Sequence, residues 1–125
     1  RNKRGLALDL KSEQGRALLL RMVKQADVLV ENFRGGTMDK LGLGYEVLKA
    51  HNPGLIYCAI TGYGRSGPYA DKGGFDLIAQ GFAGLMSITG EPGRPPVKSG
   101  SAVSDMNAGI LAALGILAAY IHKLK

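Results

Sequence analysis

Short apolar runs and amphipathic stretches alternate along most of the chain. Residues 5–10, 27–31 and 55–60 are apolar runs of strand length, and the last has the strongest strand character. Between and after these runs, apolar positions recur at helical spacing, which predicts helices at 12–25, 38–41, 45–51, 75–88 and 105–123. Strands and helices in this order predict an α/β fold with a parallel sheet and Rossmann-like, right-handed crossovers.

The last predicted helix contains the longest apolar stretch. Residues 106–121 form a nearly uninterrupted apolar run of sixteen positions, which is shorter than the roughly 20 residues that a membrane span requires. Small residues along it suit close packing against other helices: Ala108, Gly109, Ala112, Ala113, Gly115, Ala118 and Ala119. We therefore predict a core helix and a protein that does not enter a membrane.

Composition and charge are those of an ordinary soluble domain. The chain has 125 residues, 46% hydrophobic and 21% charged, which suffices for one domain with a core. The net charge of +6 favours an anionic partner, but nucleic acid, a membrane surface, phosphorylated cofactors and plain solubility all fit it. Cys58 is the single cysteine, and residues 1–4 lead into no apolar signal core. We expect a cytoplasmic protein, or one of the mitochondrial or peroxisomal matrix in a eukaryote.

Three apparent motifs do not support the chemistry they suggest. Residues 62–67 match G-x-G-x-x-G after a strand, but Pro68 and the glycines that follow prevent the helix that a dinucleotide site needs. Ser66 lies in a segment one residue short of a G-x-S-x-G nucleophile elbow. His51 and His122 are far apart and have no partners at ligand spacing, so we expect no metal site.

Asp105 is the acidic residue that stands out. It lies between a loop rich in Gly, Ser and Pro and the start of the last helix. Ser104 or Asp105 could cap that helix by accepting a hydrogen bond from its first turn. Alternatively, the Asp105 carboxylate could attack an activated acyl group as a nucleophile. In that case the free N–H groups and positive dipole of the helix at 104–107 would stabilise the negative charge of Asp105, and nearby glycine loops could bring backbone donors to the developing oxyanion.

Several sequence blocks, taken in order, resemble those of a known family. They are 2–10 (NKRGLALDL), 26–34 (ADVLVENFR), 41–45 (LGLGY), 52–53 (NP), 60–64 (ITGYG) and 67–68 (GP). Their order and spacing resemble family III CoA-transferases, a family that includes formyl-CoA and carnitine CoA-transferases and is related to α-methylacyl-CoA racemases. The resemblance implies that residues 1–125 are part of the large, CoA-binding catalytic domain. It also implies that the smaller second domain of the family is absent from this chain.

The resemblance also implies a reaction and a nucleophile. Asp105 matches the family's catalytic aspartate, which forms a mixed anhydride and then a thioester with CoA. Phe75 and Asp76 would line the active site. The racemases have a histidine where this chain has Phe75, and a phenyl ring cannot transfer a proton, so CoA transfer is favoured over racemisation.

The resemblance places coenzyme A, as a substrate, on residues early in the chain: Leu8, Lys11, Asn32, Phe33, Lys40 and Leu41. The lysines would lie near phosphates. Leu8 and Leu41 also fit a hydrophobic core, and Lys11 and Lys40 fit solvated helix ends. The partners implied are an acyl-CoA, a carboxylic acid acceptor and a second copy in an interlocked homodimer, with no permanently bound cofactor.

Two alternatives remain open. One is a racemase-like enzyme acting on CoA thioesters, which Phe75 disfavours. The other is a basic α/β module that binds a partner or nucleic acid without chemistry. The sequence has no lysine and arginine cluster on one helix face and no basic patch rich in aromatic residues, which argues against nucleic acid.

Overall fold

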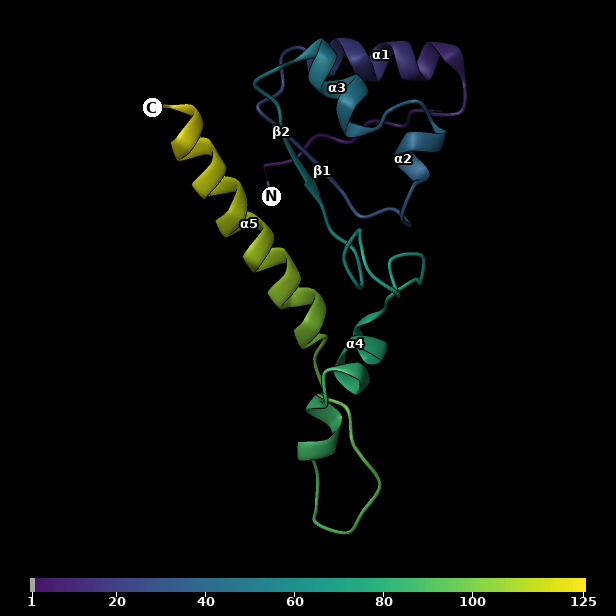
Figure 1. Ribbon diagram of the computed structural model, residues 1–125, viewed down its shortest axis with the longest axis vertical. Helices are drawn as coiled ribbons and strands as arrows, with labels where there is room; N and C mark the ends of the chain where they lie inside the picture. Colours follow the sequence, from purple (N-terminus) through teal and green to yellow (C-terminus); the bar gives the residue numbers. More distant parts are fainter. Residues whose placement is uncertain (1) are drawn as a thin grey trace. The chain divides into compact units, whose positions relative to one another are not determined.

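The computed structural model describes residues 2–125 and has a mixed α/β architecture (Figure 1). In chain order the elements are α1 (Glu13–Val23), β1 (Val28–Glu31), α2 (Thr37–Lys40), α3 (Tyr45–His51), β2 (Ile56–Ala59), α4 (Asp76–Phe82), the 3-10 helix η1 (Leu85–Ile88) and α5 (Val103–Lys123). The chain divides into two compact units. The first comprises the residues up to Leu29 and Gly36–Tyr57, and the second comprises Val30–Gly35 and Cys58–Lys125.

The strands β1 and β2 pair in a two-stranded parallel sheet. The N–H of Ile56 donates to the carbonyl of Asp27, and the N–H of Ile60 donates to the carbonyl of Glu31, each at 2.9 Å. Both pairs have the same offset in sequence, so the strands run in the same direction. The helices α2 and α3 form the crossover that a parallel pair needs. The predicted α/β fold class with a parallel sheet is confirmed.

The predicted strand at residues 5–10 does not form. This segment has no regular secondary structure before a turn at Leu10, and Leu6 is 60% exposed. A strand needs a neighbour that takes up its N–H and C=O groups, and among the described residues only β1 and β2 pair. Alternating hydrophobicity indicates a backbone suited to a sheet, but it cannot supply that neighbour.

The core of the chain lies in the first unit. Val23, Met38, Leu43, Leu48 and Leu55 are buried there in one cluster. Partly buried residues surround them: Leu10, Leu19, Leu20, Ala26, Leu29, Leu41 and Tyr57. Each fully buried side chain of this size contributes about 1.5–3 kcal/mol to folding. This cluster is therefore the main hydrophobic stabilisation of the first unit.

Two polar contacts fix the ends of helices around this core. Ser12 caps α1, because its hydroxyl accepts the N–H of Gly15 at 3.0 Å. The side chain of Asn52 donates to the carbonyls of Val23 and Ala26 at 2.9 and 2.8 Å, which closes the end of α1 against the end of α3. The predicted helices 12–25 and 45–51 are thus observed within two residues.

The second unit contains α4, η1 and α5. The single helix predicted at 75–88 is wrong, because α4 ends at Phe82 and η1 begins at Leu85. Gly84 between them has a φ of +79°, a left-handed conformation that a regular helix does not contain. Apolar residues keep their helical spacing across this break, so the spacing alone does not show where α4 ends. Tyr63, Tyr69 and Phe82 form an aromatic cluster with centroids 5.3–5.5 Å apart, which holds the glycine-rich loop to α4.

The helix α5 is longer than predicted and is not a core helix within this chain. It begins at Val103, and none of its residues is buried. Its large apolar side chains are 56–66% exposed: Met106, Ile110, Leu111, Leu114, Leu117 and Ile121. The apolar sequence of a helix indicates that the helix packs against something, but it does not identify the partner. By length and composition alone, α5 could also cross a membrane.

Candidate active site

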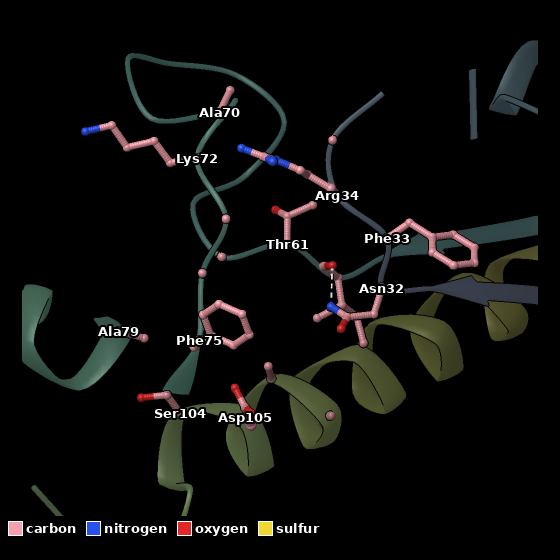
Figure 2. Close-up of a pocket in the computed structure, with 17 residues that line it drawn as sticks. Asn32, Phe33, Arg34, Thr61, Ala70, Lys72, Phe75, Ala79, Ser104 and Asp105 are labelled. Carbon is pink, nitrogen blue, oxygen red and sulfur yellow. Dashed lines mark hydrogen bonds between the residues drawn. The ribbon is translucent and has the colours of Figure 1, made fainter. Parts of the chain in front are cut away.

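The second unit has a pocket of about 840 Å³ (Figure 2). Its walls come from the loop after β1 (residues 32–35), the end of β2 (60–62), the glycine-rich loop (70 and 72–75) and the first turns of α4 and α5. The residues that follow the carboxyl ends of both strands therefore line the same pocket. Open parallel sheets bind ligands at this edge, which makes the pocket the best candidate site.

Asp105 lies in the pocket wall on the first turn of α5 (Figure 2). It is the third residue of the helix and is exposed. Within residues 2–125, no hydrogen bond or ion pair engages its carboxylate. A carboxylate with both oxygens available in a pocket can bind a proton donor or attack an electrophile.

The N-terminus of α5 is capped, but not by Ser104 or Asp105. The N-cap residue is Ala102, which has no side chain that can accept a hydrogen bond. Instead, Oδ1 of Asp76 accepts the N–H groups of Ser104 and Asp105 at 2.8 and 3.3 Å. Of the two alternatives left open by the sequence, capping by Ser104 or Asp105 is therefore not observed, since Asp76, 28 positions before Ser104, takes that role.

The same capping changes the expected supply of donors. Of the other first-turn N–H groups, that of Val103 donates to Ser101 and that of Met106 donates to Ala102, at 2.9 and 3.0 Å. The Met106 bond is the first regular bond of the helix, and the N–H groups of residues 103–105, which a helix N-terminus normally leaves free, all have partners. The expectation of free N–H groups at 104–107 fails for residues 104–106, so these N–H groups are not free to interact with the carboxylate of Asp105.

Asp76 belongs to a network behind the pocket wall, and it is not one of the pocket's lining residues. Its Oδ2 accepts from Nε2 of Gln80 at 2.6 Å. Gln80 is fully buried, and its Oε1 accepts the N–H of Ser99 at 2.8 Å. Periodicity did not identify Gln80, although its i+4 spacing from Asp76 was a signal that both side chains share one face of α4.

Phe75 lines the pocket as well. It is the N-cap residue of α4 and is 75% exposed. Figure 2 shows its ring above the first turn of α5, where Ser104 and Asp105 lie. A phenyl ring there contributes shape and apolar surface next to the carboxylate and no titratable group.

Asn32 and Phe33 lie in the pocket wall as well. The side chain of Asn32 donates to the carbonyl of Ile60 at 2.7 Å, which links the ends of the two strands (Figure 2). The N–H of Phe33 donates to the carboxylate of Glu31 at 2.7 Å, and its ring is 47% exposed. Asn32 thus shapes the loop, and Phe33 is left as an exposed aromatic surface for a ligand.

The other residues expected to contact CoA belong to the first unit: Leu8, Lys11, Lys40 and Leu41. Leu41 packs against the hydrophobic core, which is a structural role. Leu8 is half-buried, while Lys11 and Lys40 are exposed and can meet an anion. None of the four lines the pocket of the second unit.

Two cations line the pocket that the sequence analysis did not identify. Arg34 follows Phe33 directly, and Lys72 lies in the glycine-rich loop with its Nζ 4.5 Å from the centre of the Tyr69 ring. Together with Asp105 they are the charged residues of the pocket wall. The pocket can therefore attract an anion and present a carboxylate to it.

Gly62 and Gly74 bring the two ends of the glycine-rich loop together at the pocket. A Cβ on either residue would lie 2.5 Å from the Cα of the other. Side chains do not fit at that distance, so both positions require glycine for the loop to close. The high glycine content of this region thus has a geometric cause at the site itself.

Comparison with known proteins shows which family has a similar sequence. The sequence model of CoA-transferase family III matches residues 1–125. The chain is 51% identical over 125 residues to the succinate–glutarate CoA-transferase of Agrobacterium fabrum, covering all of this chain and 31% of that protein. It is 46% identical over 119 residues to the succinyl-CoA–D-citramalate CoA-transferase of Chloroflexus aurantiacus, covering 95% of this chain and 30% of that protein.

A solved structure agrees with the sequence comparison. A CaiB/BaiF family protein from Brucella suis superposes with a TM-score of 0.96 at 48% identity, covering 99% of this chain and 33% of that one. This chain therefore spans about a third of the length of these relatives. The resemblance drawn from the sequence blocks is confirmed, and the chain belongs to CoA-transferase family III.

Proposed function

We propose that the protein carrying this chain transfers CoA between an acyl-CoA thioester and a carboxylic acid, with Asp105 as the nucleophile. The observation that carries the proposal is the unengaged Asp105 carboxylate in the pocket wall, on a helix whose first turn is held by Asp76. Family membership supports the reaction class. The proposal concerns the full-length enzyme, because this chain spans only about a third of its relatives.

The reaction follows from the chemistry of a carboxylate facing a thioester. An oxygen of Asp105 attacks the thioester carbonyl, the C–S bond breaks, and a mixed anhydride and CoA thiolate result. The thiolate then attacks the side-chain carbonyl of Asp105, which releases the original acid as its carboxylate and leaves an aspartyl-CoA thioester. An incoming carboxylate repeats these two steps in reverse order and leaves as the new acyl-CoA. No net proton is transferred, so a lone carboxylate suffices.

The substrate class that fits the pocket best is a dicarboxylic acid and its CoA thioester. The relatives are named for succinate, glutarate and citramalate. When one carboxyl group of such an acid reacts at Asp105, the second remains negatively charged. Arg34 and Lys72 in the same pocket can attract that second charge. A monocarboxylic acid would leave these cations without a counter-charge.

In the second unit we assign CoA contacts to the loop of Asn32 and Phe33, and in the first unit we assign phosphate contacts to Lys11 and Lys40. The exposure of Phe33 and of both lysines supports this placement. A homodimer, a second domain and a cytoplasmic location complete the proposal. The exposed apolar surface of α5 supports burial against another part of the protein or a second copy.

The test is to trap the covalent intermediate. The full-length enzyme is mixed with succinyl-CoA without an acceptor, quenched, digested and analysed by mass spectrometry. We expect the peptide containing Asp105 to gain the mass of CoA minus water, and the adduct to disappear when glutarate is added before the quench. Asp105→Asn should give no adduct and lower transfer by at least about a thousandfold, because an amide cannot form the anhydride.

The control is Asp71→Asn, which removes an exposed carboxylate from the same unit. It should form the adduct at the wild-type rate. An Asp105→Asn enzyme that folds and transfers CoA within a few-fold of wild type would remove Asp105 from the mechanism.

A further inference from the structure

Two carboxylates lie close together at the start of α5, and their surroundings differ sharply. Both oxygens of Asp76 accept hydrogen bonds, Oδ1 from the N–H groups of Ser104 and Asp105 and Oδ2 from Gln80. The carboxylate of Asp105 accepts none from the described residues. Asp76 is thus occupied in holding the helix, and Asp105 is available for reaction.

Gln80 completes the contact by using both ends of its amide. Its Nε2 donates to Asp76 at 2.6 Å, and its Oε1 accepts the N–H of Ser99 at 2.8 Å. Because the side chain is fully buried, an unmatched donor or acceptor there would be costly. The position therefore requires a donor toward Asp76 and an acceptor toward Ser99, which an amide provides and a carboxylate does not.

The network matters because little else holds the beginning of α5 within the second unit. The helix has no side-chain cap of its own and no buried residue. Asp76 binds its first turn, and Gln80 binds Ser99 in the segment that leads into it. The N–H of Asp105 is itself one of the bonds to Asp76, so the network fixes the backbone from which the reacting carboxylate extends. A negative charge at this end also suits the helix dipole.

We propose that Asp76 and Gln80 are positioning residues that set the Asp105 carboxylate in the pocket. This inference rests on the proposed role of Asp105 as nucleophile and assigns no chemistry to Asp76 or Gln80. Their contribution is alignment, which strongly affects a reaction between two bound groups, since a misplacement of about 1 Å can cost about a hundredfold in rate.

The experiment exchanges the donor and the acceptor between the two side chains in the full-length enzyme. Asp76→Asn leaves one oxygen for the N–H groups of α5 but turns an NH₂ group toward the NH₂ group of Gln80. Gln80→Glu places two carboxylates face to face. In the double variant, the new amide at position 76 donates to the new carboxylate at position 80, which still accepts the N–H of Ser99. The hydrogen bond between the two side chains is then reversed in direction, and the bonds to the N–H groups of Ser99, Ser104 and Asp105 are kept. The long bond from Nε2 of Gln80 to the carbonyl of Ser101, at 3.5 Å, is lost in the double variant.

The expected result separates positioning from general stability. Each single variant should lower kcat by about 10- to 100-fold, with KM for both substrates within about threefold of wild type. The double variant should recover kcat to within about fivefold of wild type. Amide exchange at Ser104 and Asp105 should be faster in the single variants and return in the double variant, while Asp71→Asn changes neither quantity.

Three outcomes would overturn the inference. Single variants with wild-type kcat would show that alignment does not depend on this network. A double variant that folds like wild type but keeps the low kcat would do the same. The inference would also be overturned if the variants showed a lower kcat, a higher KM and a lower thermal stability together, because that combination indicates a general packing role. Failure of the proposed function itself is recognised separately, because the Asp105→Asn enzyme would then remain active and no adduct would form.

Discussion

The two compact units differ in what they bury. The first unit buries five hydrophobic side chains in one cluster. In the second unit, the buried residue among those described is Gln80, a polar side chain, while α5 exposes its apolar surface. The first unit is therefore stabilised mainly by non-directional burial, and the second is held by directional hydrogen bonds and close backbone contacts.

This difference fits the placement of the candidate site. Hydrophobic packing tolerates small shifts, but hydrogen bonds fix groups within a few tenths of an ångström. Asp105, the proposed nucleophile, belongs to the unit that contains such hydrogen bonds between Asp76 and α5 and between Asn32 and Ile60. The same unit contains the close backbone contact of Gly62 with Gly74. The unit that carries the proposed nucleophile thus contains little hydrophobic core of its own.

The largest effect is expected in the hydrophobic cluster of the first unit. Leu48 is fully buried, so Leu48→Ala should lower the free energy of unfolding by about 2–5 kcal/mol. Val47 is its neighbour in α3 and is 40% exposed, so Val47→Ala should cost less than about 1 kcal/mol. Hydrogen exchange of the full-length protein should show the loss in α1 and α3. Equal effects of the two substitutions would contradict a core at this place.

A smaller effect is expected where the second unit depends on a backbone contact. Gly74→Ala should cost about 1–3 kcal/mol, because the new methyl group would lie 2.5 Å from the Cα of Gly62. Gly73→Ala is the matched control, since a Cβ there meets nothing within 4 Å. Exchange in the 61–75 loop should accelerate only in the first variant. If both variants behave alike, the loop does not depend on the Gly62–Gly74 contact.

Ligand binding tests the CoA contacts proposed in each unit. Phe33→Ala in the second unit and Lys40→Ala in the first should each weaken CoA binding about fivefold, or about 1 kcal/mol. Binding by the wild type should weaken as salt rises, and binding by Lys40→Ala should weaken less steeply, since one phosphate contact is gone. Lys98→Ala removes an exposed lysine outside the proposed contacts and should change neither quantity. A Phe33→Ala/Lys40→Ala double variant with wild-type affinity, measured by calorimetry, would remove the proposed CoA placement.

The sequence predicted the elements that are governed by local rules. The helices α1 and α3 and the strands β1 and β2 were predicted within two residues, because apolar spacing and the signals at Ser12 and Asn52 act over short distances. Where the prediction failed, the cause was a partner or a local backbone state. The segment 5–10 has no strand to pair with among the described residues, and Gly84 breaks a helix whose apolar spacing continues past it.

The site was predicted in part, for the same reason. Asp105, Phe75, Asn32 and Phe33, which the sequence singled out for different roles, all line one pocket. The cap from Asp76 could not be inferred, because it joins positions 28 residues apart through a side-chain oxygen. A residue that can cap its own helix is the default expectation from sequence. Only the three-dimensional arrangement shows that another carboxylate has taken the role.

The smallest effect on folding is expected on the exposed apolar surface of α5. This prediction concerns the second unit, which exposes apolar side chains where the first unit buries them. Leu114 and Leu117 are each 57% exposed, so their replacement by Gln should change the stability of this chain by about 0.5 kcal/mol or less.

If another surface normally covers these side chains, the isolated 125-residue chain should self-associate through them, and the Leu114→Gln/Leu117→Gln double variant should associate less. Sedimentation velocity over a range of concentrations measures this directly. Ile88→Gln is the control, because Ile88 is 83% exposed but lies outside α5, and it should leave association unchanged. A wild-type chain that stays a monodisperse monomer at high concentration would mean that α5 is stable without a cover, and the contrast between the two units would then be one of composition and not of missing contacts.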